Sequence, residues 1–226
     1  MHPDSEERAV ARFDEALAAE CARLQLPLTR PRAGALSGHY RLLRRWAPKV
    51  NLTTVLEPED AAIRHGVDSL LFHAVLPERL PDLVDVGTGA GFPGIALAIC
   101  RPDTRVTLVE PIRKRISFLR SVVAALDLPS VTVVEGRLEP SGPLPEGFLA
   151  SALVSRATWE PSAWIRMGAR GLAPGGLLVT SAGRGAPEPS ALAQTARQVG
   201  LAPLDRRTFR LSGDLVRVLD LFHRPD

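Results

Sequence analysis

A glycine-rich segment near the middle of the chain has the composition of a cofactor-binding loop. It spans Asp85–Gly94, reads DVGTGAGFPG, and overlaps the end of the apolar run Leu83–Val86. Glycine lets a backbone turn tightly and lets a ligand approach it closely. In open α/β sheets, ligands bind where a strand end passes into the next helix. The segment therefore predicts a ligand site at the end of a parallel strand.

Two cofactor classes use a loop of this kind, and its residues discriminate between them. A dinucleotide site requires G-x-G-x-x-G, but Phe92 stands where the third glycine would be. The Asp85 carboxylate would also repel a pyrophosphate. S-adenosylmethionine carries an ammonium, a sulfonium and no phosphate, and a hydrogen bond from its ammonium to Asp85 would contribute about 1.5–3 kcal/mol. The loop therefore favours S-adenosylmethionine over a dinucleotide and over a turn without a ligand.

A second acidic residue is placed to hold the ribose of the cofactor. Glu110 follows the strand-like run Arg105–Val109, and an acid in this place can accept hydrogen bonds from ribose hydroxyls. Both cofactor classes contain a ribose. Glu110 therefore supports a nucleoside site without choosing between the two.

The residues expected at the end of the fourth strand indicate the methyl acceptor. They read Ser155-Arg156-Ala157, without the Asn/Asp-Pro-Pro-aromatic turn typical of exocyclic amine methylation. Carbon-5 methylation of cytosine needs a cysteine nucleophile, and we expect Cys21 and Cys100 to pack in the core. Guanine N7 has an in-plane lone pair and no proton to lose, so positioning and electrostatics suffice. Because arginine recognises the neighbouring O6, an arginine-rich site without an obvious base suits a guanine N7 acceptor.

Basic and aromatic residues are candidates for contact with a nucleic acid. Arg137 follows the third expected strand and Arg156 the fourth, so both should lie on the ligand face. Trp159 and Trp164 could stack on a base, although core packing is favoured for both. His65 could bind RNA or cap local structure. An early helical stretch carries further cations that could face RNA, although solvent is favoured: Arg41, Arg44, Arg45 and Lys49.

Hydrophobic periodicity predicts strands that alternate with helices after a helical N-terminal third. The expected helices are Glu6–Leu24, His39–Trp46, Asp60–Val75, Ile95–Cys100, Arg113–Leu126, Ser162–Gly171 and Ser190–Val199. The expected strands are Leu83–Val86, Arg105–Val109, Val131–Val134, Ala152–Val154, Leu177–Thr180, Thr208–Leu211 and Leu215–Phe222. The stretch Leu26–Gly38 is rich in proline, arginine and glycine, which indicates a connector.

This alternation predicts right-handed βαβ units and a parallel sheet. The expected fold class is α/β, with a doubly wound, mostly parallel seven-stranded sheet of the class I S-adenosylmethionine-dependent methyltransferase type. Only Ser212–Asp214 separates the last two strands, which predicts an antiparallel hairpin. We expect one domain over 1–226, with a helical N-terminal extension over 1–78 and a Rossmann-like core over 79–226.

Composition limits the remaining possibilities. A chain of 226 residues can bury one good core, and its formal charge of +3 permits nucleic-acid binding without demanding it. Its two cysteines fit a reducing cytoplasm and argue against disulfides or a zinc site, so we expect no metal. No apolar stretch reaches about 18 residues, and the N-terminus lacks a secretory signal. We therefore expect a cytoplasmic protein without a membrane span.

Together these residues resemble the small-subunit ribosomal RNA guanine-N7 methyltransferases, the RsmG or GidB family. The resemblance runs from about His39 to Phe222. Beyond the glycine-rich segment it rests on Asn51-Leu52-Thr53, Arg64-His65, Asp68-Ser69, Lys114-Arg115, Phe118-Leu119-Arg120, Arg137 with Glu139, and Ser155-Arg156-Ala157. It implies methylation of one guanine in the 530 loop of 16S ribosomal RNA, in the small ribosomal subunit. We expect the protein to be a monomer.

The resemblance also implies roles for individual residues. Arg137 and Arg156 would be catalytic, at the site of methyl transfer. The cofactor would be bound by Asp85, Gly87, Thr88, Gly89, Gly91, Phe92, Glu110, Leu138 and Arg156. RNA would be bound by Arg64, His65, Lys114, Arg115, Arg137 and Arg184.

Two positions depart from the family pattern. The family usually has an acid at the start of the fourth strand, where this chain has Ser151, and a lysine after the fifth strand, where it has Ala182. Arg184 could supply the missing charge, although arginine and lysine differ in reach and geometry. Three alternatives follow: a divergent paralogue with another RNA target, an RNA-binding protein with weak catalysis, and a small-molecule methyltransferase. The arginines on the ligand face disfavour the last of these.

Overall fold

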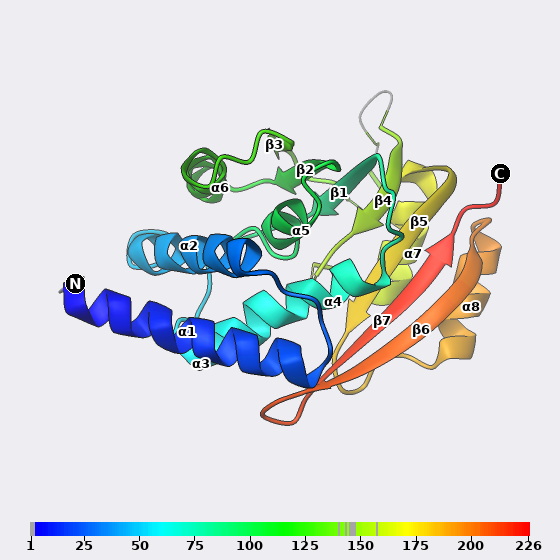
Figure 1. Ribbon diagram of the computed structural model, residues 1–226. Coiled ribbons are helices and arrows are strands. Elements are labelled where there is room, and N and C mark those ends of the chain that lie inside the picture. Colours follow the sequence, from blue (N-terminus) through cyan, green and yellow to red (C-terminus); the bar gives the residue numbers. More distant parts are fainter. Residues whose placement is uncertain (1–2, 140, 143, 145–147, 157) are drawn as a thin grey trace.

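One seven-stranded sheet forms the centre of the protein (Figure 1). The computed structural model describes residues 3–139, 141–142, 144, 148–156 and 158–226. Strands β1 to β5 pair in parallel, whereas β7 is antiparallel to both β5 and β6. This arrangement confirms the doubly wound α/β class and the C-terminal hairpin. The order is β3-β2-β1-β4-β5-β7-β6, with β1 Asp82–Val86, β2 Arg105–Glu110, β3 Val131–Glu135, β4 Ala150–Val154, β5 Leu172–Ala182, β6 Ala202–Leu211 and β7 Leu215–His223.

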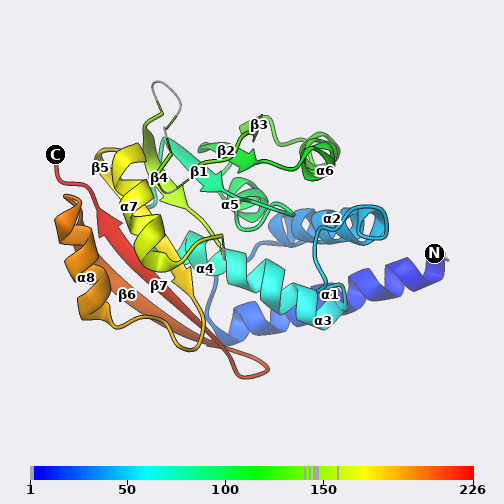
Figure 2. The same ribbon diagram turned by 180° about the vertical axis from the view of Figure 1, so that it is seen from behind.

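The inner strands are apolar on both faces because helices cover both sides of the sheet. Along β1, Leu83 belongs to one buried cluster, whereas Val84 and Val86 belong to the other. Helices α5 and α6 pack in the first cluster, and α7 and α8 in the second (Figure 2). The bounds of these helices are α5 Gly94–Cys100, α6 Arg113–Ala125, α7 Pro161–Gly171 and α8 Pro189–Gln198.

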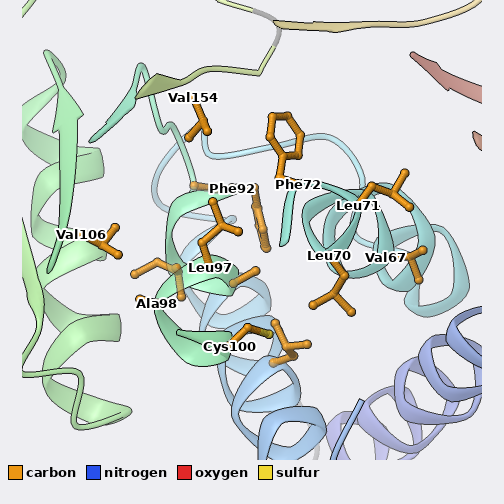
Figure 3. Close-up of a cluster of buried hydrophobic side chains, with 14 of the residues drawn as sticks. Val67, Leu70, Leu71, Phe72, Phe92, Leu97, Ala98, Cys100, Val106 and Val154 are labelled. Carbon is orange, nitrogen blue, oxygen red and sulfur yellow. The ribbon is translucent and has the colours of Figure 1, made fainter. Parts of the chain in front are cut away.

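The N-terminal third is helical and packs beside the sheet, as expected. Its elements are α1 Pro3–Arg23, α2 Arg30–Trp46, α3 Pro58–Ala61, the π-helical turn η1 Ala62–Val67 and α4 Asp68–Val75. Figure 3 shows Val67 and Phe72 of this layer with Leu97 and Cys100 of α5 and Val106 of β2. The same buried cluster therefore joins the N-terminal helices to the sheet, and Cys100 is a core residue.

Some element bounds differ from the expectation. The connector expected over Leu26–Gly38 is helical from Arg30, because Pro31 suits a first helical turn and Leu36 packs in the core. The helical stretch expected over Asp60–Val75 is confirmed, with the π-helical turn η1 between α3 and α4. Strands β5 and β6 begin earlier than their apolar runs, since backbone pairing extends them: Leu172 pairs with Ala150, and Ala202 with His223.

The C-terminal hairpin is tied to the N-terminal helix α1. The Glu20 carboxylate accepts hydrogen bonds from the Ser212 backbone N–H at 2.8 Å and from its hydroxyl at 2.7 Å. Arg23 Nη2 donates to the Arg210 carbonyl at 2.7 Å. The hydrogen bond from Arg23 and those from Ser212 lower the pKa of the buried Glu20 to about 2. Helix and hairpin are thus fixed to each other although Glu20 and Ser212 lie 192 positions apart.

Candidate active site

A cavity of about 470 Å³ opens at the carboxyl ends of β1, β2, β3 and β4. Ligands of open α/β sheets bind at this edge. The cavity brings together Glu110, Leu138, Arg137 and Arg156, which follow three different strands. Its wall is formed by Val86, Gly87, Val109, Glu110, Pro111, Ile112, Arg115, Gly136, Arg137, Leu138, Glu139, Arg156, Thr158 and Trp159.

Glu110, the last residue of β2, brings a carboxylate to the cavity wall. Its Oε2 accepts a hydrogen bond from the Gly89 N–H at 3.0 Å, and its Oε1 accepts one from the Ile112 N–H at 3.1 Å. Arg115 Nη1 lies 3.7 Å from Oε1. Two carboxylate oxygens offer about four acceptor sites. Glu110 therefore fixes the loop and still has acceptor capacity for ribose hydroxyls.

The glycines of the loop adopt positive φ at Gly87, Gly89 and Gly91. A Cβ atom on Gly87 would lie 2.5 Å from Thr158 Oγ1, and one on Gly91 would lie 2.6 Å from Ile95 Cγ1. A Cβ on Gly89 would have only the Gly87 carbonyl in its vicinity, at 4.0 Å. Packing therefore requires glycine at the first and third positions, whereas the space beside Gly89 is open to a ligand.

Asp85 lies behind the loop, not on the cavity wall. Its Oδ2 accepts hydrogen bonds from the Thr88 hydroxyl at 2.6 Å and from the Gly94 N–H at 2.8 Å. Its Oδ1 is buried without a hydrogen-bond partner in the part of the chain that the structure describes. Burial raises the pKa of Asp85 to about 6. Asp85 and Thr88 thus hold the two ends of the loop together, and a contact of Asp85 with the cofactor ammonium stays a prediction.

Phe92 supports the loop from the core and its ring does not line the cavity (Figure 3). It is stacked between His39 and His65, whose ring centroids lie 4.4 Å and 4.7 Å from its own. Burial lowers the pKa of His39 to about 3 and that of His65 to about 4. Both histidines are therefore neutral at pH 7. His65 is enclosed, so this geometry does not present it to RNA.

Arg156 reaches the cavity with part of its guanidinium already engaged. Nη1 donates to the Arg64 carbonyl at 2.7 Å and to Asp68 Oδ2 at 3.0 Å. Nη2 lies 3.5 Å from His65 Nδ1, and the guanidinium carbon lies 5.5 Å from the centroid of the Phe92 ring. The sequence suggests a guanidinium whose nitrogens are all free to face guanine. In the structure, Nη1 is instead bonded to the protein.

The wall formed by the residues after β2 and β3 combines apolar and charged groups. Ile112 is 45% exposed and Leu138 is buried, and both line the cavity. Arg137 is exposed, and its Nη1 donates to Glu139 Oε1 at 3.3 Å. The apolar pair suits the faces of an adenine ring, and the exposed guanidinium suits a phosphate or base edge.

The other cations expected to bind RNA come from three different parts of the chain. Arg115 lines the cavity, and its Nε donates to the Asn51 carbonyl at 3.2 Å. Lys114 is exposed at the start of α6, and Arg64 is half-exposed on η1. Arg184 follows β5 and donates to the Asp214 carbonyl at 2.8 Å. Of these four cations, Arg115 lines the cavity and Arg184 is bonded to the hairpin turn.

The two tryptophans have different environments. Trp164 is buried, and its Nε1 donates to the Val179 carbonyl at 2.9 Å. Trp159 stacks on Trp164 with a centroid distance of 5.4 Å and an interplanar angle of 8°. Core packing is confirmed for Trp164, whereas Trp159 also lines the cavity.

The two departures from the family pattern do not alter the cavity wall. The Ser151 N–H and hydroxyl donate to the Asp82 carboxylate at 2.8 Å and 3.0 Å, at the amino-terminal end of the strands. Ala182 ends β5 and pairs with Val218. Neither Ser151 nor Ala182 lines the cavity.

Sequence reasoning missed the role of Asp68 and did not consider Arg217. Asp68 is fully buried and accepts hydrogen bonds from both Arg156 and Arg217. The available signals were the carboxylate at the start of the apolar stretch Asp68–Val75 and the isolated cation within the strand Leu215–His223.

The residues present fit S-adenosylmethionine. A cavity of about 470 Å³ lies within the range that holds a small ligand. The open space beside Gly89, the carboxylate of Glu110 and the apolar side chains of Ile112 and Leu138 match a loop-bound nucleoside. Among the described residues no group of three or more His, Cys, Asp or Glu is placed to hold a metal ion. None of the helices described has the length and apolarity that a membrane crossing requires.

Known proteins are similar to this chain in sequence and in fold. The family model described as "rRNA small subunit methyltransferase G" matches residues 32–200. The ribosomal RNA small subunit methyltransferase G of Anaeromyxobacter sp. strain Fw109-5 is 40% identical, over 88% of this chain and 91% of its own length.

Solved structures match at the level of the fold. A methyltransferase from Pyrococcus furiosus matches with a TM-score of 0.56 and 12% identity, over 86% of this chain and 100% of its own. A mutant 16S rRNA adenine-N1 methyltransferase from Catenulisporales acidiphilia, solved with its cosubstrate SAM, matches with a TM-score of 0.52 and 18% identity, over 65% of this chain and 85% of its own. The extent of the match to the family model and the sequence identity to the Anaeromyxobacter relative together show that the chain belongs to the rRNA small subunit methyltransferase G family.

Proposed function

We propose that this protein transfers a methyl group from S-adenosylmethionine to N7 of a guanine in the 530 loop of 16S ribosomal RNA. The observation that carries the proposal is the cavity at the strand ends, in a member of this family, which both Glu110 and Arg156 line. The substrate would be the small ribosomal subunit or its RNA.

The reaction requires little chemistry from the protein itself. Bound S-adenosylmethionine supplies an electrophilic methyl group: the N7 lone pair forms the new N–C bond as the C–S bond breaks, the sulfonium becomes a thioether, and guanine takes the positive charge. No proton moves, so the cavity needs no general base. The residues of this chain then act by positioning the two reactants.

The cavity residues divide into a cofactor end and an acceptor end. Glu110 would accept hydrogen bonds from the ribose, while Ile112 and Leu138 would enclose the adenine. The turn at Gly87 would face the methionine portion. Arg156, with Trp159 beside it, would orient the guanine, and the outer cations would hold the RNA backbone: Arg64, Lys114, Arg115, Arg137 and Arg184.

We further propose that the protein acts as a cytoplasmic monomer and as one domain, without a metal ion. The buried cluster shared by the N-terminal helices and the sheet supports the single domain. Ribosomal RNA as the substrate supports the location.

The decisive test is the methylation state of the RNA. Small-subunit RNA from a strain that lacks the gene should have lost one N7-methylguanine in the 530 loop, and the purified protein should restore it with S-adenosylmethionine. S-adenosylhomocysteine, but not NAD, should raise the melting temperature, since a ligand at about 100 times its Kd stabilises by about 2.7 kcal/mol. Unchanged methylation in the deletion strain would contradict the proposal, and RNA binding without methyl transfer would favour an RNA-binding protein.

A further inference from the structure

A buried carboxylate beside the cavity is shared by two arginines from distant parts of the chain. Asp68 is the first residue of α4 and is 0% exposed. Arg217 of β7 donates to its Oδ1 at 2.6 Å through Nε and to its Oδ2 at 2.9 Å through Nη2. Arg156 donates to the same Oδ2 at 3.0 Å. Both arginine side chains are mostly buried, with 16% and 17% exposure.

The carboxylate does not need both arginines. A buried charge is costly unless it is paired and hydrogen-bonded, and Arg217 alone already satisfies both oxygens of Asp68 in a bidentate pair. Adding Arg156 leaves the cluster with a surplus positive charge. Charge neutralisation therefore does not explain why Arg156 is bonded to Asp68.

The π-helical turn before Asp68 supplies a second hydrogen-bond acceptor to Arg156. In an α-helix the Asp68 N–H would donate to the Arg64 carbonyl. In the π-helical turn η1 it donates instead to the carbonyls of Ile63 and His65. The Arg64 carbonyl accepts Arg156 Nη1 at 2.7 Å. Turns of this kind occur frequently at functional sites.

Two acceptors thus fix one nitrogen of Arg156. The hydrogens of Nη1 are directed to the Arg64 carbonyl and to Asp68 Oδ2, which defines the plane of the guanidinium. Nε has no protein hydrogen-bond partner among the described residues. Among the described residues this leaves Nε as an unpaired donor of a side chain that lines the cavity.

We propose that Asp68 is a positioning residue, which together with the Arg64 carbonyl holds Arg156 at the acceptor end of the cavity. The inference rests on the proposed methyl transfer. Arg217 holds the carboxylate in place through its bidentate pair, and it does not itself line the cavity.

The test compares single-turnover methylation of small-subunit particles at saturating S-adenosylmethionine. Asp68→Asn should slow methyl transfer about 10-fold to 100-fold, because a small misplacement of a positioning group is costly. Affinity for S-adenosylhomocysteine should stay within about 2-fold of wild type. The matched control is Asp220→Asn, which breaks another buried carboxylate–arginine pair, with Arg206 at 2.5 Å, away from the cavity. The control should lower stability and leave the rate unchanged.

A double-mutant cycle distinguishes positioning from a general structural role. If Asp68 acts through Arg156, Asp68→Asn should cause no further loss of rate in an Arg156→Ala background. Additive losses, or a wild-type rate for Asp68→Asn, would overturn the inference. Should Asp68→Asn not fold, Asp68→Asn with Arg217→Met removes the orphaned cation, and the same loss of rate is expected. A wild-type protein that methylates no small-subunit RNA would instead refute the proposed function itself.

Discussion

At the scale of single residues, Glu110 connects the loop to the cavity in which the cofactor would bind. We expect Glu110→Gln to weaken the binding of S-adenosylhomocysteine by about 1.5–3 kcal/mol, near the contribution of a hydrogen bond to a charged group. The fold should persist, since the amide oxygen can still accept from one of the two backbone N–H groups, of Gly89 and Ile112, that the carboxylate binds. Isothermal titration calorimetry measures the change directly.

The control for this variant is Glu135→Gln. Glu135 ends β3 in register with Glu110, but it is bonded to Arg113 at 2.8 Å and does not line the cavity. Its affinity for S-adenosylhomocysteine should match wild type. If both variants bind S-adenosylhomocysteine with the same affinity, Glu110 does not contact the cofactor.

Under the proposed function, Trp159 on the cavity wall would stack on the target base. One of its faces is occupied by Trp164, which is anchored to the Val179 carbonyl. Stacking on an aromatic side chain contributes about 1–3 kcal/mol per base. Trp159→Ala should therefore raise the KM for small-subunit particles roughly 5-fold to 100-fold, whereas Trp159→Phe should retain most of the affinity. An unchanged KM for Trp159→Ala would show that the indole belongs only to the packing around α7.

The sequence predicted the location of some site residues but not the contacts of others. Glu110 could be placed at the cavity because an acid after a strand end has a fixed location in this sheet topology. The partners of Arg156 could not be predicted, because Asp68 lies 88 positions away and meets it only in the folded protein. The π-helical turn that presents the Arg64 carbonyl has no apolar periodicity that distinguishes it from an α-helix.

At the scale of elements, the loop after β1 performs two separable tasks. Gly91→Ala should be strongly destabilising, because its Cβ would meet Ile95 at 2.6 Å and His39 at 3.2 Å at a φ of +88°. Gly89→Val should cost about 1–3 kcal/mol for the strained backbone but block the open space beside the loop. We therefore expect Gly91→Ala to lower the melting temperature, and Gly89→Val to lose cofactor binding while it remains folded.

Calorimetric unfolding and titration of both variants separate these outcomes. A folded Gly89→Val protein with wild-type affinity for S-adenosylhomocysteine would show that the loop is not the cofactor cradle. A Gly91→Ala protein as stable as wild type would show that Ile95 can move to accommodate the added Cβ atom.

Element type was more predictable than element bounds. Apolar or strand-like runs marked all seven strands of the sheet. The apolar runs were clearest for β1, β2 and β4, since strands buried on both faces need such runs. Proline, arginine and glycine in the stretch before His39 indicated a connector, yet α2 begins at Arg30, since a proline in the first turn is compatible with a helix. The pairing of β6 with β7 extends over exposed polar residues, so no apolar pattern marks where β6 begins.

At the scale of the whole molecule, buried histidines set how stability depends on pH. Burial lowers the pKa of His39 to about 3 and of His65 to about 4, below the value of about 6.5 in an unfolded chain. The unfolded state therefore binds protons first as the pH falls. Stability is fully present above about pH 6.5 and should decline below it by about 1.4 kcal/mol per pH unit for each histidine.

Asp85 opposes this trend over part of the range. Burial raises its folded pKa to about 6, so protonation of Asp85 favours the folded state as the pH falls from about 6 towards its unfolded value. Urea unfolding at pH 7.5 and 5.5 should still show a net loss of stability. His39→Phe preserves a ring against Phe92 and removes one titrating group, so its pH dependence should be shallower. Equal unfolding free energies at both pH values for wild type would contradict the assignment.

The link between Glu20 and Ser212 determines when the protein can complete its structure during synthesis. Helix α1 leaves the ribosome well before the partners of Glu20 and Arg23 at the hairpin turn, because Ser212 follows Glu20 by 192 positions. Until then, the carboxyl end of α1 lacks these contacts, and closing so long a loop has an entropic cost. The N-terminal layer therefore cannot reach its final stability before the hairpin has been made. Emergence of the hairpin, and not of the glycine-rich loop, is the step that completes this contact.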